Sequence, residues 1–179
     1  VLWIGIGGSG LGPKLIINSL EGVNTGLKFH FIDNVDPIGI SDTLSSLPKQ
    51  ISTVLVCVVS KSGGTPEPKL GMDISRDYIE QQGGNWSSQA VAITMKNSKL
   101  DNIAKSESWL RSFDLPEWVG GRTSITGAVG LLPISLIGSN IDDFLKILNL
   151  WLGIFKKMVY RKNYSSILTF RESNISSKR

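Results

Sequence analysis

The segment with the most evident chemistry is the hexapeptide Ser-Lys-Ser-Gly-Gly-Thr at residues 60–65. It directly follows an apolar run at 53–59 that predicts a buried strand. Glycines let backbone N–H groups turn toward an anion, and serine and threonine hydroxyls donate further hydrogen bonds. Pro66 and Glu67 are typical of a helix start, and the positive end of that helix would point at the same place. The pattern predicts a phosphate-binding loop.

A second glycine-rich loop lies near the amino end of the chain. Residues 5–10 read Gly-Ile-Gly-Gly-Ser-Gly after a predicted strand at 1–4. The glycine spacing fits the dinucleotide fingerprint, and Asp33 ends the next predicted strand, where a ribose-binding acid would lie. A dinucleotide-binding domain is therefore one alternative, and a tight turn without any ligand is another. One small phosphorylated ligand held between the two loops, with Ser9 donating a hydrogen bond, is the simpler interpretation.

Strands and helices alternate along most of the chain. The predicted strands are 1–4, 27–33, 54–59, 90–94 and 118–119. The predicted helices are a run ending near residue 20, a short helix within 37–47, and helices at 70–82 and 99–104. This order predicts an α/β fold with a doubly wound parallel sheet flanked by helices. Both glycine loops follow strands, which is where ligands bind in such sheets.

The carboxyl-terminal part of the chain is different in character. An apolar run at 128–134 precedes a long helix that we expect from Ser139 or Asn140 to about Tyr160. From Tyr164 onward the sequence predicts no element. Residues 155–179 contain seven Lys and Arg but a single Glu, so they carry the whole positive excess of the chain, whose net charge is +4.

The composition excludes several classes of function. Because the rest of the chain is near neutral, we expect no nucleic-acid partner. No run is long and apolar enough for a membrane span, so we expect no membrane partner. The single cysteine, Cys57, excludes an internal disulfide and fits a core position in a reducing compartment. Val1 already lies within a strand, which suggests a segment of a longer protein.

Three motifs occur in a specific order: Gly-Ile-Gly-Gly-Ser-Gly-Leu-Gly-Pro at 5–13, Ser-Lys-Ser-Gly-Gly-Thr-Pro-Glu at 60–67, and Val-Gly-Gly-Arg-Thr-Ser at 119–124. With Asp-Asn-Val-Asp-Pro at 33–37, they resemble the glucose-6-phosphate isomerase family in its bacterial or plastid-like form, over roughly the first 160 residues. The resemblance implies a sugar-isomerase (SIS-type) α/β domain, the first of two. Pro68 departs from the Pro-Glu-Thr that relatives often have.

The resemblance also implies roles for particular residues. The sugar phosphate would be bound by Ser60, Lys61, Ser62 and Thr65. Gly8 and Ser9 would line the sugar pocket, and Arg122 would stabilise an enediolate. The last role makes physical sense, because a permanent cation lowers the barrier where negative charge develops. The resemblance implies no cofactor and no metal.

The general base and the ring-opening groups of the family have no counterpart in this sequence. His30 lies within a strand and is best explained as structural, and Glu67 is best explained by the helix dipole. We therefore expect the binding half of an isomerase site, inactive by itself. A non-catalytic sugar-phosphate-binding SIS domain is the first alternative, and a dinucleotide-binding domain is the second.

The resemblance leads to expectations about organisation and context. We expect a SIS-type domain at 1–138, a helix at 139–162 that leads toward a missing second domain, and a divergent or frayed tail at 163–179. The full-length protein is expected to be a cytoplasmic homodimer, or plastid-located if an upstream transit segment precedes it.

Overall fold

The computed structural model describes residues 1–19 and 26–176, with side chains as far as Met158. The chain divides into two units, Val1–Ser139 and Asn140–Arg179. The first unit contains all the strands that the structure describes. The described part of the second unit is a single helix, α7 (Ile141–Ser176). No helix within the described residues is long and apolar enough to cross a bilayer.

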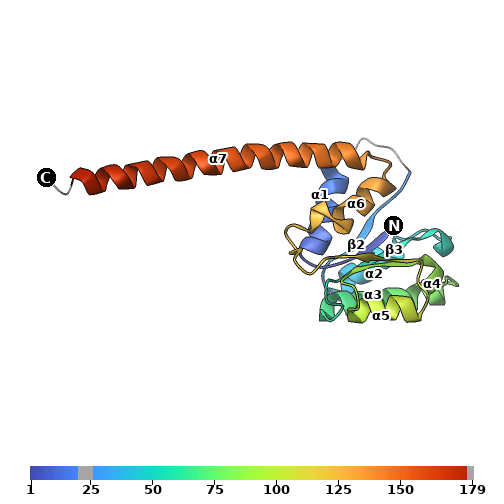
Figure 1. Cartoon of the computed structure of the whole chain (residues 1–179). Coiled ribbons are helices and arrows are strands. Elements are labelled where there is room, and N and C mark those ends of the chain that lie inside the picture. Colours follow the sequence, from blue (N-terminus) through green and yellow to red (C-terminus); the bar gives the residue numbers. More distant parts are fainter. Residues whose placement is uncertain (20–25, 177–179) are drawn as a thin grey trace. The chain divides into compact units, whose positions relative to one another are not determined.

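The first unit is built on a five-stranded sheet in the order β2-β1-β3-β4-β5, with every neighbouring pair parallel. The strands are β1 (Leu2–Ile4), β2 (His30–Ile32), β3 (Val56–Val59), β4 (Ala90–Thr94) and β5 (Arg111–Asp114). Helices flank this sheet on both faces (Figure 1), so the predicted fold class is confirmed.

Two layers of helices cover the sheet, as Figure 1 shows. One layer consists of α1 (Gly8–Ser19) and α6 (Ala128–Leu136), which pack against each other. The other layer consists of α2 (Pro37–Ser45), α3 (Pro66–Gln81), α4 (Trp86–Gln89) and α5 (Lys99–Ser106). Short 3-10 turns lie at Ile51–Thr53 and Ser124–Thr126.

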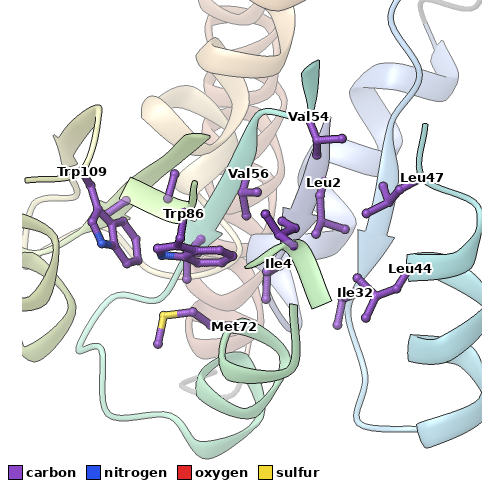
Figure 2. Packing of buried hydrophobic residues seen from close by; sticks show 14 of the residues in the cluster. Leu2, Ile4, Ile32, Leu44, Leu47, Val54, Val56, Met72, Trp86 and Trp109 are labelled. Carbon is purple, nitrogen blue, oxygen red and sulfur yellow. The ribbon is translucent and has the colours of Figure 1, made fainter. Parts of the chain in front are cut away.

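The core has two parts because side chains alternate across the sheet. Leu2, Ile4 and Val56 face the α2, α3 and α5 layer, where Figure 2 shows them packed with Trp86 and Met72. The residues between them on the strands, including Trp3 and Cys57, belong to the cluster on the other face. Burial raises the pKa of Cys57 to about 12, so this thiol is an inert core residue at neutral pH, in agreement with the sequence prediction.

Two predictions of secondary structure were wrong. The fifth strand is β5, and residues 118–119 lie in a turn in which Val119 N–H donates to the Pro116 carbonyl over 3.0 Å. The sequence of β5 is Arg-Ser-Phe-Asp, which lacks the apolar run of the other strands because it is an edge strand with exposed ends. In addition, α7 continues to Ser176, through most of the segment for which no element was predicted.

A buried carboxylate holds α5 against the sheet. Asp101 Oδ2 accepts hydrogen bonds from Asn97 N–H over 2.7 Å and from Lys105 Nζ over 2.6 Å. Its Oδ1 accepts from Ser112 Oγ of β5 over 2.8 Å. The hydrogen bond from Lys105, followed by those from Asn97 and Ser112, lowers the pKa of Asp101 to about 2. One ionised side chain therefore connects the start of α5, the preceding loop and β5.

Replacing this carboxylate should weaken the fold in a pH-dependent way. The folded pKa of Asp101 lies below its unfolded value near 4, so its ionised form stabilises the fold above about pH 4 and that contribution is lost as the pH falls through about 2. Asp101→Asn should lower the free energy of unfolding at pH 7 by about 1–3 kcal/mol, measured with urea. The deficit should shrink toward pH 2. Asp77→Asn, which changes an exposed carboxylate of α3, is the matched control and should have little effect. A pH-independent deficit for Asp101→Asn would contradict this explanation.

Candidate functional site

The chain changes direction at the centre of the sheet. From β1 it moves to β2 at one edge, then returns to β3 on the other side of β1 and continues to β4 and β5. Helix α1 follows β1 and helix α3 follows β3, and these two helices lie on opposite faces of the sheet (Figure 1). A crevice forms outside the carboxyl ends of the strands at such a point, because the two helices diverge. Ile4 pairs with Val58, so the loops at 5–10 and 60–65 begin side by side at this position.

The loop at 60–65 is folded around its own hydroxyl groups. Ser60 Oγ accepts a hydrogen bond from Gly63 N–H over 3.2 Å, and Ser62 Oγ accepts one from Gly64 N–H over 3.1 Å. Gly63 has a φ of 65°, and a Cβ there would lie 2.3 Å from the backbone nitrogen of Leu100. Only glycine fits this position, because the left-handed conformation and the close approach to α5 both exclude a side chain.

Thr65 ends this loop as the N-cap residue of α3. Its side chain makes no capping hydrogen bond, so its hydroxyl remains available to a ligand. Ser62 is exposed, and Lys61 and Thr65 are partly exposed. The start of α3 therefore offers hydroxyl groups, one lysine and the positive end of a helix dipole to an anion, the combination that the sequence predicted.

The loop that contains Arg122 touches the first glycine loop. A Cβ on Gly8, the first residue of α1, would lie 1.9 Å from the carbonyl oxygen of Gly121. The loop is fixed from within, because Ser124 Oγ donates to the Gly121 carbonyl over 2.9 Å and Thr123 Oγ1 accepts from Gly120 N–H over 3.1 Å. The backbones of these two segments thus meet in direct contact, although more than 100 residues separate them in the sequence.

Lys61 connects the phosphate-binding loop with the same region. Its Nζ donates a hydrogen bond to the carbonyl oxygen of Glu117, five residues before Arg122. Sequence analysis did not find this contact, because the acceptor is a backbone carbonyl and carries no side-chain signal. Arg122 is exposed, and its guanidinium has no hydrogen-bond or ion-pair partner among the described residues. The structure therefore brings the two glycine loops and the Arg122 loop to one edge of the sheet.

A cavity of about 160 Å³ lies beside the phosphate-binding loop. Ser60 and Thr65 line it, together with Lys69 and Lys99, whereas Lys61 and the other predicted site residues do not. The remaining lining side chains belong mostly to the apolar core between α3 and α5: Val58, Pro68, Met72, Leu100 and Ile103. A hexose needs polar partners around its hydroxyl groups, so this apolar cavity does not suit the sugar.

The dinucleotide alternative meets an obstacle at Asp33. Lys14 Nζ lies 2.5 Å from Asp33 Oδ2 and 5.4 Å from the centre of the Phe31 ring. The carboxylate that a ribose would need is therefore occupied by a lysine. The turn itself requires glycine at position 10, since a Cβ there would lie 2.5 Å from the Gly5 carbonyl oxygen. The glycine spacing is explained by the tight turn from β1 into α1.

These features define a class of protein: a parallel α/β domain with loops rich in glycine and hydroxyl groups at the switch point of its sheet. The comparisons identify the class more closely. The family model described as phosphoglucose isomerase matches residues 1–170. A glucose-6-phosphate isomerase of Prochlorococcus marinus (strain MIT 9211) is 66% identical over 145 residues, which are 81% of this chain and 27% of the relative. Another, from a second strain of the same species, is 58% identical over 168 residues, or 94% of this chain and 32% of the relative.

Solved structures agree with this assignment. A glucose-6-phosphate isomerase from Chlamydia trachomatis superposes with a TM-score of 0.70 at 34% identity, covering 75% of this chain and 25% of that chain. A hypothetical protein from Thermus thermophilus gives the same TM-score of 0.70 and identity of 34% over 79% of this chain and 34% of its own. The chain belongs to the phosphoglucose isomerase family. It spans between a quarter and a third of the length of these curated relatives.

The contact between the glycine loop and the Arg122 loop can be tested with two single-methyl changes. Gly8→Ala should lower the free energy of unfolding by about 1–3 kcal/mol, because the new methyl group overlaps the Gly121 carbonyl and forces the loops apart. Gly121→Ala is the matched control, since a Cβ at Gly121 meets nothing within 4 Å. Urea denaturation of both variants gives the comparison. Equal stability of the two would show that the loops do not approach each other this closely.

Proposed function

We propose that this chain is the sugar-phosphate-binding part of a glucose-6-phosphate isomerase, which interconverts glucose 6-phosphate and fructose 6-phosphate. The observation that carries the proposal is the meeting of three loops at the switch point of the sheet. Two of these loops are rich in glycine and hydroxyl groups, and the third presents a guanidinium that no other described residue pairs with. The names of the relatives support the substrate class.

The residues divide into two groups with different tasks. Ser60, Ser62 and Thr65 surround the start of α3, so they hold the phosphate together with the helix dipole and Lys61. Gly8 and Ser9 border the crevice where α1 begins, and their small size leaves room for the sugar. The phosphate anchors the substrate, and the rest of the molecule then extends toward the Arg122 loop.

Arg122 supplies the charge that the reaction needs. Removal of a proton next to the carbonyl group produces an enediolate, and a guanidinium is a permanent cation that stabilises this negative charge as it forms. Because Arg122 has no ion-pair partner among the described residues, its charge is not neutralised in advance. Lys61 holds the backbone of the same loop through Glu117, which limits the movement of Arg122 before substrate arrives.

The wider organisation follows from the same proposal. Residues 1–138 form the sugar-phosphate-binding domain, and helix α7, which begins at Ile141, leads toward a second domain that supplies the base and the ring-opening groups. The full-length protein is a homodimer. Its location is the cytoplasm, because the single cysteine is a buried free thiol and hexose phosphates are intracellular substrates.

Binding to the purified chain should depend on the phosphate group. Calorimetry should show binding of glucose 6-phosphate and little or no binding of glucose, since the hydroxyl groups of the loop, Lys61 and the start of α3 bind the phosphate group. Lys61→Ala should weaken binding of the phosphorylated ligand by about 1–3 kcal/mol, the value of a charged hydrogen bond. Lys28→Ala, at the opposite end of the strands, is the control. Equal affinities for glucose and its phosphate would refute the site.

The purified chain should convert fructose 6-phosphate to glucose 6-phosphate slowly or not at all. A positioned general base contributes about 10²–10⁴-fold in rate, and the proposal assigns that base to the second domain. A coupled assay measures the turnover. Glu67, in the first turn of α3, is the carboxylate to test as a general base within this chain. Turnover typical of an enzyme, abolished by Glu67→Gln, would show that the base lies within this chain.

A further inference from the structure

A buried chain of hydrogen bonds joins the loop at 60–65 to strand β4 and helix α5. The Lys61 carbonyl oxygen accepts from Met95 N–H over 3.0 Å and from Thr94 Oγ1 over 3.2 Å. Thr94 Oγ1 also lies 2.6 Å from Ser98 Oγ, which accepts from Asp101 N–H over 3.1 Å. The side chains of Thr94, Ser98 and Asp101 are all buried. These hydrogen bonds connect the start of α5 with the backbone of the loop.

The chemistry of the acceptor determines the direction of each hydrogen bond. A carbonyl oxygen can only accept, so the single hydroxyl proton of Thr94 is donated to Lys61. The donor between Thr94 Oγ1 and Ser98 Oγ is therefore Ser98, whose oxygen accepts in turn from Asp101 N–H. All three bonds run in one direction and end on the Lys61 carbonyl. Hydrogen bonds aligned in this way polarise and strengthen one another.

The fixed carbonyl determines where the next backbone N–H points. In a trans peptide the carbonyl and the following N–H point in opposite directions. Because Lys61 C=O is bound by Thr94 and Met95, Ser62 N–H points away from these residues at the end of β4. Ser62 N–H has no hydrogen-bond partner among the described residues. An unpaired donor of the loop is thus turned outward and is available to a ligand.

The hydroxyl of Thr94 is unusual for its position in the strand. Ala90 and Ala92, four and two residues earlier on the same face of β4, belong to the apolar cluster beneath α3 and α5. An apolar side chain would suit such a position, because a buried hydroxyl is costly unless it is hydrogen-bonded. The bond to Lys61 therefore gives the hydroxyl at position 94 a purpose that core packing does not.

We propose that Thr94 is a positioning residue for phosphate recognition. Its hydroxyl fixes the peptide between Lys61 and Ser62, so that Ser62 N–H donates to the phosphate group of the substrate. Thr94 is only 1% exposed, so it acts through the loop and does not touch the substrate. This role rests on the proposed function, since it requires the phosphate to bind at the loop.

Calorimetry with glucose 6-phosphate tests the contribution of the hydroxyl. Thr94→Val replaces the hydroxyl with a methyl group and should raise the dissociation constant about three- to tenfold, the equivalent of one hydrogen bond. Thr94→Ser retains the hydroxyl and should bind as the unaltered chain does. Ser75→Ala is the matched control, because it removes another buried hydroxyl, which donates to the Gly71 carbonyl within α3 over 2.6 Å. It should lower stability without weakening binding. Unchanged binding by Thr94→Val, or equal weakening by Thr94→Val and Ser75→Ala, would overturn the proposal.

Amide hydrogen exchange without ligand separates this inference from the proposed function. Met95 N–H donates to the same Lys61 carbonyl, so loosening of the loop should expose it. Its exchange, followed by NMR, should be about three- to tenfold faster in Thr94→Val than in Ser75→Ala. Ser98→Ala removes the donor to Thr94, should shift exchange and binding in the same direction, and decides the question if Thr94→Val does not fold. Absence of binding by the unaltered chain would refute the proposed function. Unchanged Met95 exchange would refute the role of Thr94, whatever the chain binds.

Discussion

The parallel pairing of β1 with β3 is the constraint on which the rest of this domain depends. These two strands are neighbours in the sheet but are separated in the sequence by a strand and two helices. Because they are parallel, their carboxyl ends coincide, and the loop after each one begins at the same edge. Because α1 and α3 leave toward opposite faces (Figure 1), the space between the loops stays open. The proximity of the two loops at this edge is thus a consequence of strand order.

Backbone contacts, more than side-chain contacts, then fix the third loop in place. Gly8 and Gly121 approach so closely that no methyl group on Gly8 fits between them. Lys61 reaches across to a backbone carbonyl of the same region. Hydrogen bonds from Ser124 and Thr123 close the loop on itself. The result is that Arg122, whose guanidinium has no ion-pair partner among the described residues, lies in a loop that contacts both glycine-rich segments.

The proposed function assigns binding and proton transfer to different parts of the protein. Holding a phosphate requires N–H groups, hydroxyl groups and one cation, all of which a single α/β domain offers at one strand end. Moving a proton between two carbon atoms requires a base aligned with the sugar. Several large apolar side chains of the long helix α7, among them Trp151 and Phe155, are exposed.

Local signals in the sequence determined much of this. Apolar runs predicted β1, β3 and β4, because parallel strands covered on both faces need such runs, while β2 was predicted from a mixed segment at 27–33. Glycine and hydroxyl spacing indicated both loops, and the order of the three motifs indicated the family. The position of Ser60, Lys61 and Thr65 after a strand and at the start of a helix could also be predicted, because it depends on local sequence, while their role in binding a phosphate stays a prediction.

Only the tertiary structure decided the remaining features, and the reason is the same in each case. The edge strand β5 has an ordinary polar sequence, and it forms because β4 offers unpaired N–H and carbonyl groups beside it. The acceptor for Lys61 is the Glu117 carbonyl, and any residue provides a carbonyl. The contact of Gly8 with Gly121 joins segments that are far apart in the chain. These interactions depend on which backbone atoms meet in space. The residues adjacent to each position in the sequence therefore do not predict which distant segment it contacts.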